Sequence, residues 1–530
     1  MSSTCWLMSS LSRAFPRIVP GANPAPQLLA ARGERLSVQA CARYDGDDHA
    51  PVAIRVSAPD GIAVRVRRVG HVPMPHFNTA TPIEELDGIG HIPGLVPDPL
   101  FDDLGMVLGP HETGAFWLTV AIDPECASGD REIGVEVVVG EARYSLAFTV
   151  SVADLVLRPR RNFPATHWFY ADALCDWYKV EPFDRRFWAI LEPYLVDCAE
   201  HGLDTLLCPL FTPPTDGVKR PTQLVRVTRE GEGYGFDFAD VKRWVGLARA
   251  SGIANIEWTH FFSQWGVRNA LRVYEGQGRD EKLLWAPETG ATSETYRSFL
   301  AQFLPAFRRF LDAEGLLARS FFHVSDEPHG PEHLRNYQAA RALLKELAPW
   351  MRTMDALSEI EYGRDRVTDM PIPSIGVTKQ YWREDIESWT YFCCGPRGRF
   401  VNRLLDTPLQ KTRMLGWLFY RFRRLGFLHW GHNYWYRSQT RKLIDPYTVT
   451  DGEAWPGWAY GDTHVVYPGP DGPVDSIRWE VFAESLQDFA LLQTADVDPD
   501  GELLSPLVDF DDFPRSDGWI DRARRSVLMG

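Results

Sequence analysis

Residues 293–329, SETYRSFLAQFLPAFRRFLDAEGLLARSFFHVSDEPH, contain the pattern that decides the fold. Apolar residues first recur at the spacing of an amphipathic helix, and Gly315 fits the left-handed cap that ends many helices. The run RSFFHVSDE (319–327) is then short, apolar and followed by a proline, which predicts a buried strand. A helix that leads into a buried strand is the repeating unit of an α/β fold.

The same alternation extends on both sides of this stretch. Seven further strands are predicted, at residues 165–170, 204–210, 254–260, 350–356, 373–380, 390–394 and 426–430. Helices are predicted between them, including RRFWAILEPYLVDCAEHG (185–202), ADVKRWVGLARASG (239–252), PEHLRNYQAARALLKELAP (331–349) and KTRMLGWLFYRFRRLG (411–426). Eight strands alternating with helices favour a TIM-like (β/α)8 barrel over residues 156–495, and a doubly wound open sheet is the second architecture.

The amino-terminal part of the chain has a different period. Runs such as VAIRVSAPDGIAVRVRRVG (52–70) and REIGVEVVVGEARYSLAFTVSV (131–152) alternate apolar and polar residues between turn signals. This pattern is typical of short antiparallel strands. It predicts an N-terminal antiparallel β-sandwich domain over residues 1–155.

The carboxyl-terminal hundred residues add two features. Residues 432–473 are rich in Trp, Tyr, Gly, Asp and Pro, too polar for a core and too aromatic for a bare linker, so we expect a long functional loop after the eighth strand. A last helix is predicted at residues 476–494, and residues 496–530 are expected to form a C-terminal extension.

Composition and charge narrow the function. The chain has 530 residues and a formal charge of -15, which disfavours nucleic acid and anionic lipid as partners. Of 19 tryptophans, 17 lie beyond residue 150, and flat indole faces can stack on sugar rings, although most of these tryptophans are expected in the core. The opening MSSTCWLMSSLSRAFPR does not resemble a signal peptide, and no stretch approaches the ~20 apolar residues of a membrane span. We therefore expect a cytoplasmic protein, with secretion left open.

Cysteines and known motifs give no sign of a metal or a cofactor. The eight cysteines show no CxxC spacing, and the adjacent Cys393 and Cys394 are expected to be buried packing residues rather than a redox couple. No P-loop, dinucleotide-binding or nucleophile-elbow motif occurs. His323, Asp326 and His329 are close in sequence, but their spacing does not favour a metal site at a strand end. We expect no metal and no cofactor.

Two adjacent carboxylates, Asp326 and Glu327, follow the strand at 319–327 directly. In a barrel, catalytic groups lie at the carboxyl ends of the strands, and Pro328 turns the chain outward there. Both side chains can then lean over the barrel mouth, so they are the predicted catalytic pair. The alternative is structural: one carboxylate caps the next helix and the other pairs with an arginine.

Aromatic and amide side chains follow the other strand ends. Each alone is more often a packing residue, but together they suggest stacking walls and hydroxyl partners for a sugar. The predicted substrate-binding residues are Trp168, Tyr170, Trp258, His260, Tyr381, Trp382, Trp430, Asn433 and Trp435.

Four runs together resemble glycoside hydrolase family 123 and the domain of unknown function 4091 grouped with it. They are HVSDEP (323–328), GFLHWGHNYW (426–435), GDTHVVYPGPDGP (461–473) and SIRWEVFAESLQDFALL (476–492), and LLAARGERLSVQA (28–40) resembles the first strand of that family's sandwich. The resemblance implies a barrel-borne retaining exo-β-N-acetylgalactosaminidase that uses substrate-assisted catalysis. It assigns Asp326 to orienting the acetamido group and Glu327 to general acid/base catalysis. The last helix departs from the family pattern, with Ala483 and Ser485 where an Arg and a Gly are usual.

Two alternatives stay open at this point. One is a glycosidase for sugars without the acetamido group, which needs a second carboxylate about 5 Å from Glu327 as its nucleophile. The other is a glycan-binding protein without catalysis. The expected partner in every case is an oligosaccharide or glycoconjugate, and the sequence gives no oligomeric state.

Overall fold

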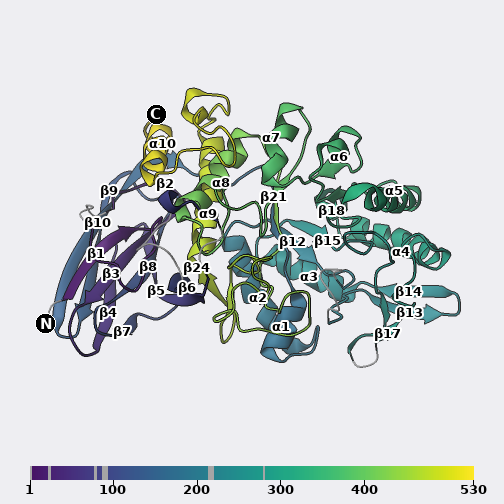
Figure 1. Cartoon of the computed structure of the whole chain (residues 1–530), viewed down its shortest axis with the longest axis horizontal. Helices are drawn as coiled ribbons and strands as arrows, with labels where there is room; N and C mark the ends of the chain where they lie inside the picture. The colour runs from purple at the N-terminus through teal and green to yellow at the C-terminus, as the bar shows by residue number, and fades with distance from the viewer. Residues whose placement is uncertain (1–2, 22–25, 77–79, 86–93, 213–219, 279–280) are drawn as a thin grey trace.

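Two β-sheets share one core at the amino-terminal side of the molecule (Figure 1), in a computed structural model that describes residues 3–21, 26–76, 80–85, 94–212, 220–278 and 281–530. The first sheet has the order β1 (Ser3–Ser9), β3 (Arg35–Tyr44), β8 (Glu112–Ile122), β5 (Ile62–Met74), β6 (Gly94–Phe101), β24 (Pro473–Ser476) and β23 (Tyr467–Pro468). The second has the order β2 (Leu28–Arg32), β10 (Ala142–Val156), β9 (Gly129–Val139), β4 (Ala50–Ser57) and β7 (Gly105–Leu108).

The predicted antiparallel domain is confirmed by these sheets. Strand β4 illustrates why they form, since Val52 and Ile54 are buried while Ala53 and Arg55 between them are exposed. Such alternation places one apolar face toward the other sheet. All pairings in the two sheets are antiparallel except that of β10 with β2, which is parallel.

Two of these strands come from late in the chain. Strand β24 pairs with β6, with Asp475 opposite Leu100, and Figure 1 shows it beside the amino-terminal strands. Helix α9 (Ile477–Thr494) follows at once, and a buried ion pair joins its Arg478 to Asp98 of β6 at 2.9 Å. The amino-terminal sheets are therefore fixed to the rest of the molecule by strand pairing and by buried charge.

The second half contains parallel strands that curl as a half-barrel. The order is β18 (Ser320–Phe322), β15 (Asn255–Trp258), β12 (Thr205–Cys208), β11 (Ala165–His167), β22 (Phe427–His429) and β21 (Thr390–Tyr391). A separate parallel pair contains β19 (Met354–Asp355) and β20 (Met370–Pro371). Single parallel bridges join Phe322 to Thr353 and Ser374 to Tyr391.

Helices lie between these strands, as expected, and two more follow β22. They are α1 (Ala171–Tyr178), α2 (Arg185–Glu200), α3 (Ala239–Ala250), α4 (Glu294–Ala313), α5 (Gly330–Leu347), α6 (Ile360–Arg364), α7 (Ile375–Arg383), α8 (Leu409–Arg421), α9 and α10 (Asp517–Met529). Gly202, Gly252 and Gly315 follow α2, α3 and α4 with positive φ, and Gly315 confirms the cap predicted there. A small sheet, not anticipated, contains β13 (Arg226–Glu230), β14 (Gly233–Asp237), β16 (Tyr274–Glu275) and β17 (Lys282–Leu283).

The strand predicted at residues 373–380 is wrong, because this segment forms α7. The Ser374 hydroxyl accepts a hydrogen bond from the Gly376 amide and caps the helix. Ile375, Thr378 and Tyr381 are buried at helical spacing. The strand in this part of the chain is the two-residue β20, which ends before the cap.

The expectation that residues 432–473 are too polar for the core is wrong for much of this loop. Residues 432–436 and 459–469 are buried, with Tyr434, Trp435 and the polar Asn433, Asp462 and His464 all 0% exposed, whereas most of residues 437–442 are exposed. Backbone and side-chain hydrogen bonds satisfy many of the polar groups, for example Tyr434 N to Thr463 O at 3.1 Å. This segment is a structural part of the carboxyl ends of the strands.

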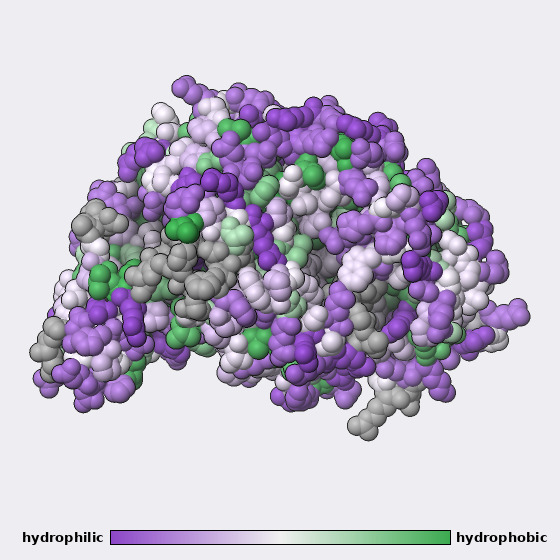
Figure 2. Space-filling view, in the orientation of Figure 1, coloured by the Kyte–Doolittle hydropathy of each residue, from purple (hydrophilic) through white to green (hydrophobic). Residues whose placement is uncertain are grey.

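Hydrophilic residues dominate the face in Figure 2, and hydrophobic residues are scattered on it in small groups. Among the described residues, no helix combines the length and apolar character needed to cross a bilayer.

Helices α8 and α9 pack closely enough to exclude a side chain at Gly416. A Cβ atom at this position would lie far inside van der Waals contact with the carbonyl oxygen of Ser485, which is backbone and cannot swing away. We therefore expect Gly416→Ala to lower the free energy of unfolding by about 3 kcal/mol. Urea denaturation measures the change.

Gly246 supplies the matched control for this prediction. It lies inside α3, and a Cβ atom there meets nothing within 4 Å. Gly246→Ala should be neutral or stabilise by up to about 1 kcal/mol through helix propensity. Equal stabilities for the two alanine variants would contradict the close α8–α9 contact.

Candidate active site

The acidic pair lies just beyond the end of β18. Asp326 is 8% exposed, whereas Glu327 is half-buried. Glu327 has φ +40°, in the left-handed region that costs a non-glycine residue about 1 kcal/mol or more. Strained backbone of this kind is concentrated at functional sites, so the observation favours a functional role for the pair.

The loop after β15 holds Asp326 from the side. Gln264 Nε2 donates a hydrogen bond of 3.4 Å to Asp326 Oδ2, and the Trp265 amide donates one of 2.8 Å to the Asp326 carbonyl. Trp265 is 37% exposed. Gln264 therefore supplies a side-chain donor to this carboxylate, and the partly exposed Trp265 is held to the Asp326 backbone; neither residue belonged to the predicted site.

Glu327 receives a hydrogen bond from β21. The Tyr391 hydroxyl donates to Glu327 Oε1 at 2.5 Å. Burial, followed by the negative charge of Glu327, raises the pKa of Tyr391 well above its usual value. Tyr391 therefore stays protonated at neutral pH and acts as a lasting donor that fixes the position of the Glu327 carboxylate.

Removing this donor should impair turnover. We expect Tyr391→Phe to lower kcat by about 10- to 100-fold, because a hydrogen bond to a charged group contributes about 1.5–3 kcal/mol. Tyr420→Phe is the control, since that hydroxyl donates to the Val497 carbonyl instead. A pH–rate profile separates positioning from folding: a shifted profile in Tyr391→Phe supports the role, and an unchanged kcat contradicts it.

A buried histidine between two carboxylates comes three residues before Asp326. His323 donates from Nε2 to Glu257 Oε1 at 2.7 Å and from Nδ1 to Asp355 Oδ1 at 3.2 Å. Burial alone would lower the pKa of His323, but the hydrogen bonds to Asp355 and then Glu257 outweigh it and raise the pKa to about 10. His323 is thus an imidazolium at neutral pH.

Asp355 also holds the backbone that leads to the pair. Its two carboxylate oxygens accept hydrogen bonds of 3.2 Å from the amides of Val324 and Ser325. The Tyr337 hydroxyl donates to the same carboxylate at 2.5 Å. The charged group at His323 therefore sets the path of the chain immediately before Asp326.

His323→Gln should destabilise the protein strongly. The change leaves two buried carboxylates without their cation, which we expect to cost about 3–5 kcal/mol of unfolding free energy near pH 6. Because the folded-state pKa is raised from 6.5 to about 10, the contribution of His323 is complete below pH 6.5 and is lost as pH rises through about 10. Denaturation series at several pH values measure the difference between variant and wild type.

The exposed His49 provides the control for that series. His49→Gln should leave stability within about 0.5 kcal/mol of wild type at each pH. A wild-type advantage over His323→Gln that grows toward high pH would contradict a charged His323.

His260 lies beside this network in the opposite protonation state. Its ring centroid is 4.5 Å from that of His323, and burial, with the charge of His323 second, lowers its pKa well below the usual value. Among the described residues, Nε2 of the neutral ring has no hydrogen-bond partner. His260 thus offers a buried polar atom that a ligand hydroxyl or a water can satisfy.

Two buried groups in the described chain bring possible metal ligands within 4.8 Å of one another. They are His260, His323 and Asp355, and Asp197, His201 and Asp475. In the first, both His323 nitrogens already donate to carboxylates, so a cation would have to displace a shared proton. In the second, His201 donates to Glu480 and lies against Asp197. The arrangement in each case is that of an internal ion-pair network.

Three predicted residues lie at the neighbouring strand ends. Trp168 Nε1 donates to Glu257 Oε1 at 2.7 Å, which connects it to His323. Tyr170 and Asn433 hold each other, with the Tyr170 amide donating to Asn433 Oδ1 at 2.8 Å. The first contact joins the end of β11 to β15, and the second joins it to the segment after β22.

Trp430 is half-buried and lies at the end of β22. Its Nε1 donates to Asp462 Oδ2 at 2.8 Å, and its ring packs against Trp458 and Tyr434. Burial raises the pKa of Asp462 to about 6. Trp430 therefore keeps part of its ring accessible while a buried carboxylate fixes its orientation.

The other four predicted substrate-binding residues make packing contacts away from the acidic pair, and two of them are Trp258 and Trp435. Trp258 Nε1 donates to Ser320 and its ring packs on Phe307 of α4, so it is Glu257 that lies on the inner face of β15. Trp435 is 0% exposed and contacts Trp177 and Tyr194.

Tyr381 and Trp382 belong to α7 instead of a strand end. The Tyr381 hydroxyl donates to the carbonyls of Leu357 and Glu359. Trp382 packs on Phe422. Their contacts hold α7 in place, because the helical period turns them toward neighbouring chain segments.

Comparison with known proteins decides the family. Residues 168–495, more than half of the chain, match the model of the glycoside hydrolase 123 catalytic domain. The chain belongs to glycoside hydrolase family 123. Membership supports glycoside hydrolysis as its activity class, with glycans as substrates.

The fold of this chain is similar to that of a solved family 123 structure. A family 123 glycoside hydrolase from Clostridium perfringens, described for glycolipid glycan hydrolysis, aligns over 100% of both chains with a TM-score of 0.76 and 13% identity. A putative alpha-galactosidase/melibiase from Bacteroides fragilis covers 93% of this chain and 80% of its own, with a TM-score of 0.26 and 9% identity, too low to bear on the fold. No curated protein matches the chain.

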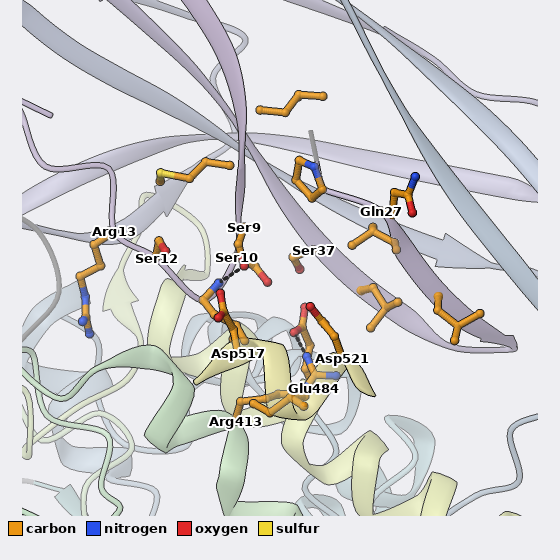
Figure 3. Close-up of a pocket in the computed structure, with 18 of the residues that line it drawn as sticks. Ser9, Ser10, Ser12, Arg13, Gln27, Ser37, Arg413, Glu484, Asp517 and Asp521 are labelled. Carbon is orange, nitrogen blue, oxygen red and sulfur yellow. Dashed lines mark hydrogen bonds and ion pairs between the residues drawn. The ribbon is translucent and has the colours of Figure 1, made fainter. Parts of the chain in front are cut away.

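The family 123 chain also has a cavity of about 830 Å³ away from the acidic pair. It lies between the strands at the amino terminus and helices α9 and α10, and Figure 3 shows Ser9 and Ser37 on one side with Glu484, Asp517 and Asp521 opposite. Burial raises the pKa of Glu484 to about 7. Because none of its described lining residues belongs to the strand-end site, we treat the cavity as separate from the active site.

Proposed function

We propose that this family 123 enzyme is a retaining exo-glycosidase that removes terminal β-linked N-acetylhexosamine, with N-acetylgalactosamine as first choice. The observation that carries the proposal is the adjacent pair at the end of β18, with Asp326 beside Gln264 and Glu327 bonded to Tyr391. The Clostridium perfringens relative makes a glycolipid or similar glycoconjugate a reasonable source of the sugar.

The proposed reaction has two steps. The carbonyl oxygen of the 2-acetamido group attacks the anomeric carbon, while Glu327 donates its proton to the departing glycosidic oxygen. Asp326 accepts the acetamido N–H and stabilises the positive charge of the resulting oxazolinium ring. Glu327 then removes a proton from water as the water attacks the anomeric carbon, so the β configuration is retained and the acetamido group is restored.

The surrounding residues suit the binding of a pyranose. Trp430 keeps part of an indole face accessible, and the neutral His260 offers an unsatisfied nitrogen among the described residues. We assign these two, with Trp168, Tyr170 and Asn433 as supports, to the walls of the sugar site. The other predicted binding residues have structural contacts instead.

We propose in the same way that the parallel strands form a (β/α)8 barrel. The order of the six-stranded sheet, the β19–β20 pair and the single bridges at Phe322–Thr353 and Ser374–Tyr391 support it. A division into residues 1–155, 156–495 and 496–530 follows the same elements, although β23 and β24 complete the amino-terminal sheet.

A panel of 4-nitrophenyl glycosides tests the proposed function. The β-N-acetylgalactosaminide should be the best substrate, the β-N-acetylglucosaminide weaker, and 2-hydroxy glycosides the weakest. The sugar should be released first as its β anomer, which proton NMR detects. Faster hydrolysis of 2-hydroxy glycosides would instead favour the mechanism with a separate carboxylate nucleophile.

A further inference from the structure

Two adjacent cysteines lie in the rim segment that follows β21. Of the eight cysteines, Cys5, Cys393 and Cys394 are partly exposed, and the other five are buried. The sulfur atoms of Cys393 and Cys394 are 3.8 Å apart, and both thiols are free. Because both cysteines are partly exposed and follow a strand end, they are not explained by buried packing alone.

Two observations link the pair to Glu327. Cys393 is two residues beyond Tyr391, which bonds to Glu327. The pKa of Cys393 is raised, first by its contact with Cys394 and by burial, and further by the negative charges of Asp462 and Glu327. The thiol is therefore within electrostatic reach of both carboxylates and is protonated at neutral pH.

Neighbouring groups hold the backbone of the pair in one conformation. Asn402 Nδ2 donates to the carbonyls of Cys393 and Pro396 at 3.0 and 3.1 Å. The Arg397 guanidinium donates to the carbonyl of Cys394 and, on its other side, to that of Gly457. A fixed backbone presents the two thiols together, which lowers the entropic cost of binding one centre with both.

We propose that Cys393 and Cys394 form a dithiol site that captures trivalent organoarsenicals, and that the captured group blocks access to Glu327. Soft sulfur ligands favour such thiophilic centres. In the reaction R–As=O plus two thiols, two As–S bonds form, the As=O bond breaks, and the oxygen leaves as water with both thiol protons. No oxidant is required, and the strain of a disulfide between adjacent cysteines is avoided.

Protonated thiols suit this chemistry better than they suit alkylation. Alkylating agents need the thiolate, which the raised pKa of Cys393 disfavours. The arsenical brings its own oxygen to accept the protons. The site should therefore react with phenylarsine oxide faster than with iodoacetamide at neutral pH.

Intact-mass measurement after treatment with phenylarsine oxide tests capture without relying on activity. Wild type should gain one phenylarsenic group that resists excess 2-mercaptoethanol and is removed by 2,3-dimercaptopropanol. Cys393→Ser and Cys394→Ser should each lose this stable adduct. Cys5→Ser should retain it, and thereby excludes a site formed by Cys5 with the neighbouring Cys41.

The second part of the proposal, that the adduct blocks access to Glu327, rests on the proposed function. It is tested by measuring hydrolysis of the aryl glycoside that the enzyme cleaves fastest. Modified wild type should lose nearly all activity and regain it with the dithiol, whereas modified Cys394→Ser should stay active. An adduct that persists in both serine variants would overturn the site, and full activity of the adduct would overturn blocking. Failure of the N-acetylgalactosaminide alone would count against the proposed substrate and leave both readouts intact.

Discussion

Glu327→Gln is expected to abolish turnover of substrates with poor leaving groups, by about 10²–10⁴-fold in kcat. Glutamine keeps the shape of the side chain and its contact with Tyr391, but it has no proton to give to the glycosidic oxygen. Activated aryl glycosides, whose leaving groups need little protonation, should lose much less in the first step. Steady-state kinetics on a series of leaving groups measures the contrast.

Glu332→Gln is the matched control for this variant. Glu332 lies on α5, exposed and paired with Arg268, and its loss should leave kcat unchanged. If Glu327→Gln loses the same factor on good and poor leaving groups, Glu327 is not the acid.

Asp326→Asn is expected to lower kcat by about 10²–10³-fold with a much smaller change in KM. Asparagine can still contact the acetamido group, but it cannot supply the negative charge that the oxazolinium ring attracts. The loss therefore appears in the transition state and not in ground-state binding. Kinetics on the aryl N-acetylgalactosaminide separate the two parameters.

A thiazoline analogue of the cyclised intermediate sharpens this test. It should bind wild type tightly and Asp326→Asn poorly, while Asp312→Asn, an exposed change on α4, should behave as wild type. A thiazoline that both proteins ignore would remove the reason to assign Asp326 to the acetamido group.

Much of the fold was predictable because its longer elements have strong periodicity. Helix α4 and the strand β4 show periods of 3.6 and 2 that match their burial. The two-residue strands β19 and β20 are too short to give such a signal. The segment predicted as a strand after β20 is a helix that begins after its N-cap residue, Ser374. Short elements depend on tertiary contacts that periodicity does not contain.

Asp326 and Glu327 could be proposed as the catalytic pair from the sequence, because two adjacent carboxylates directly after an apolar strand are unusual. The residues that hold this pair and His323 in place could not be predicted. In β15 both Glu257 and Trp258 are buried, so the apolar pattern could not tell which one faces inward. Asp355 lies 32 residues along the chain from His323, and Tyr391 lies 64 residues from Glu327. Only the folded arrangement of the strands brings each pair together.

The nucleophilicity of the acetamido oxygen tests the central claim most directly. Replacing the acetyl methyl hydrogens of an aryl N-acetylgalactosaminide by one, two and three fluorines weakens that oxygen stepwise without changing the leaving group. If it attacks the anomeric carbon, kcat/KM should fall at each step, by about 100-fold or more over the series. A rate independent of fluorination would contradict substrate assistance by the site at Asp326 and Glu327.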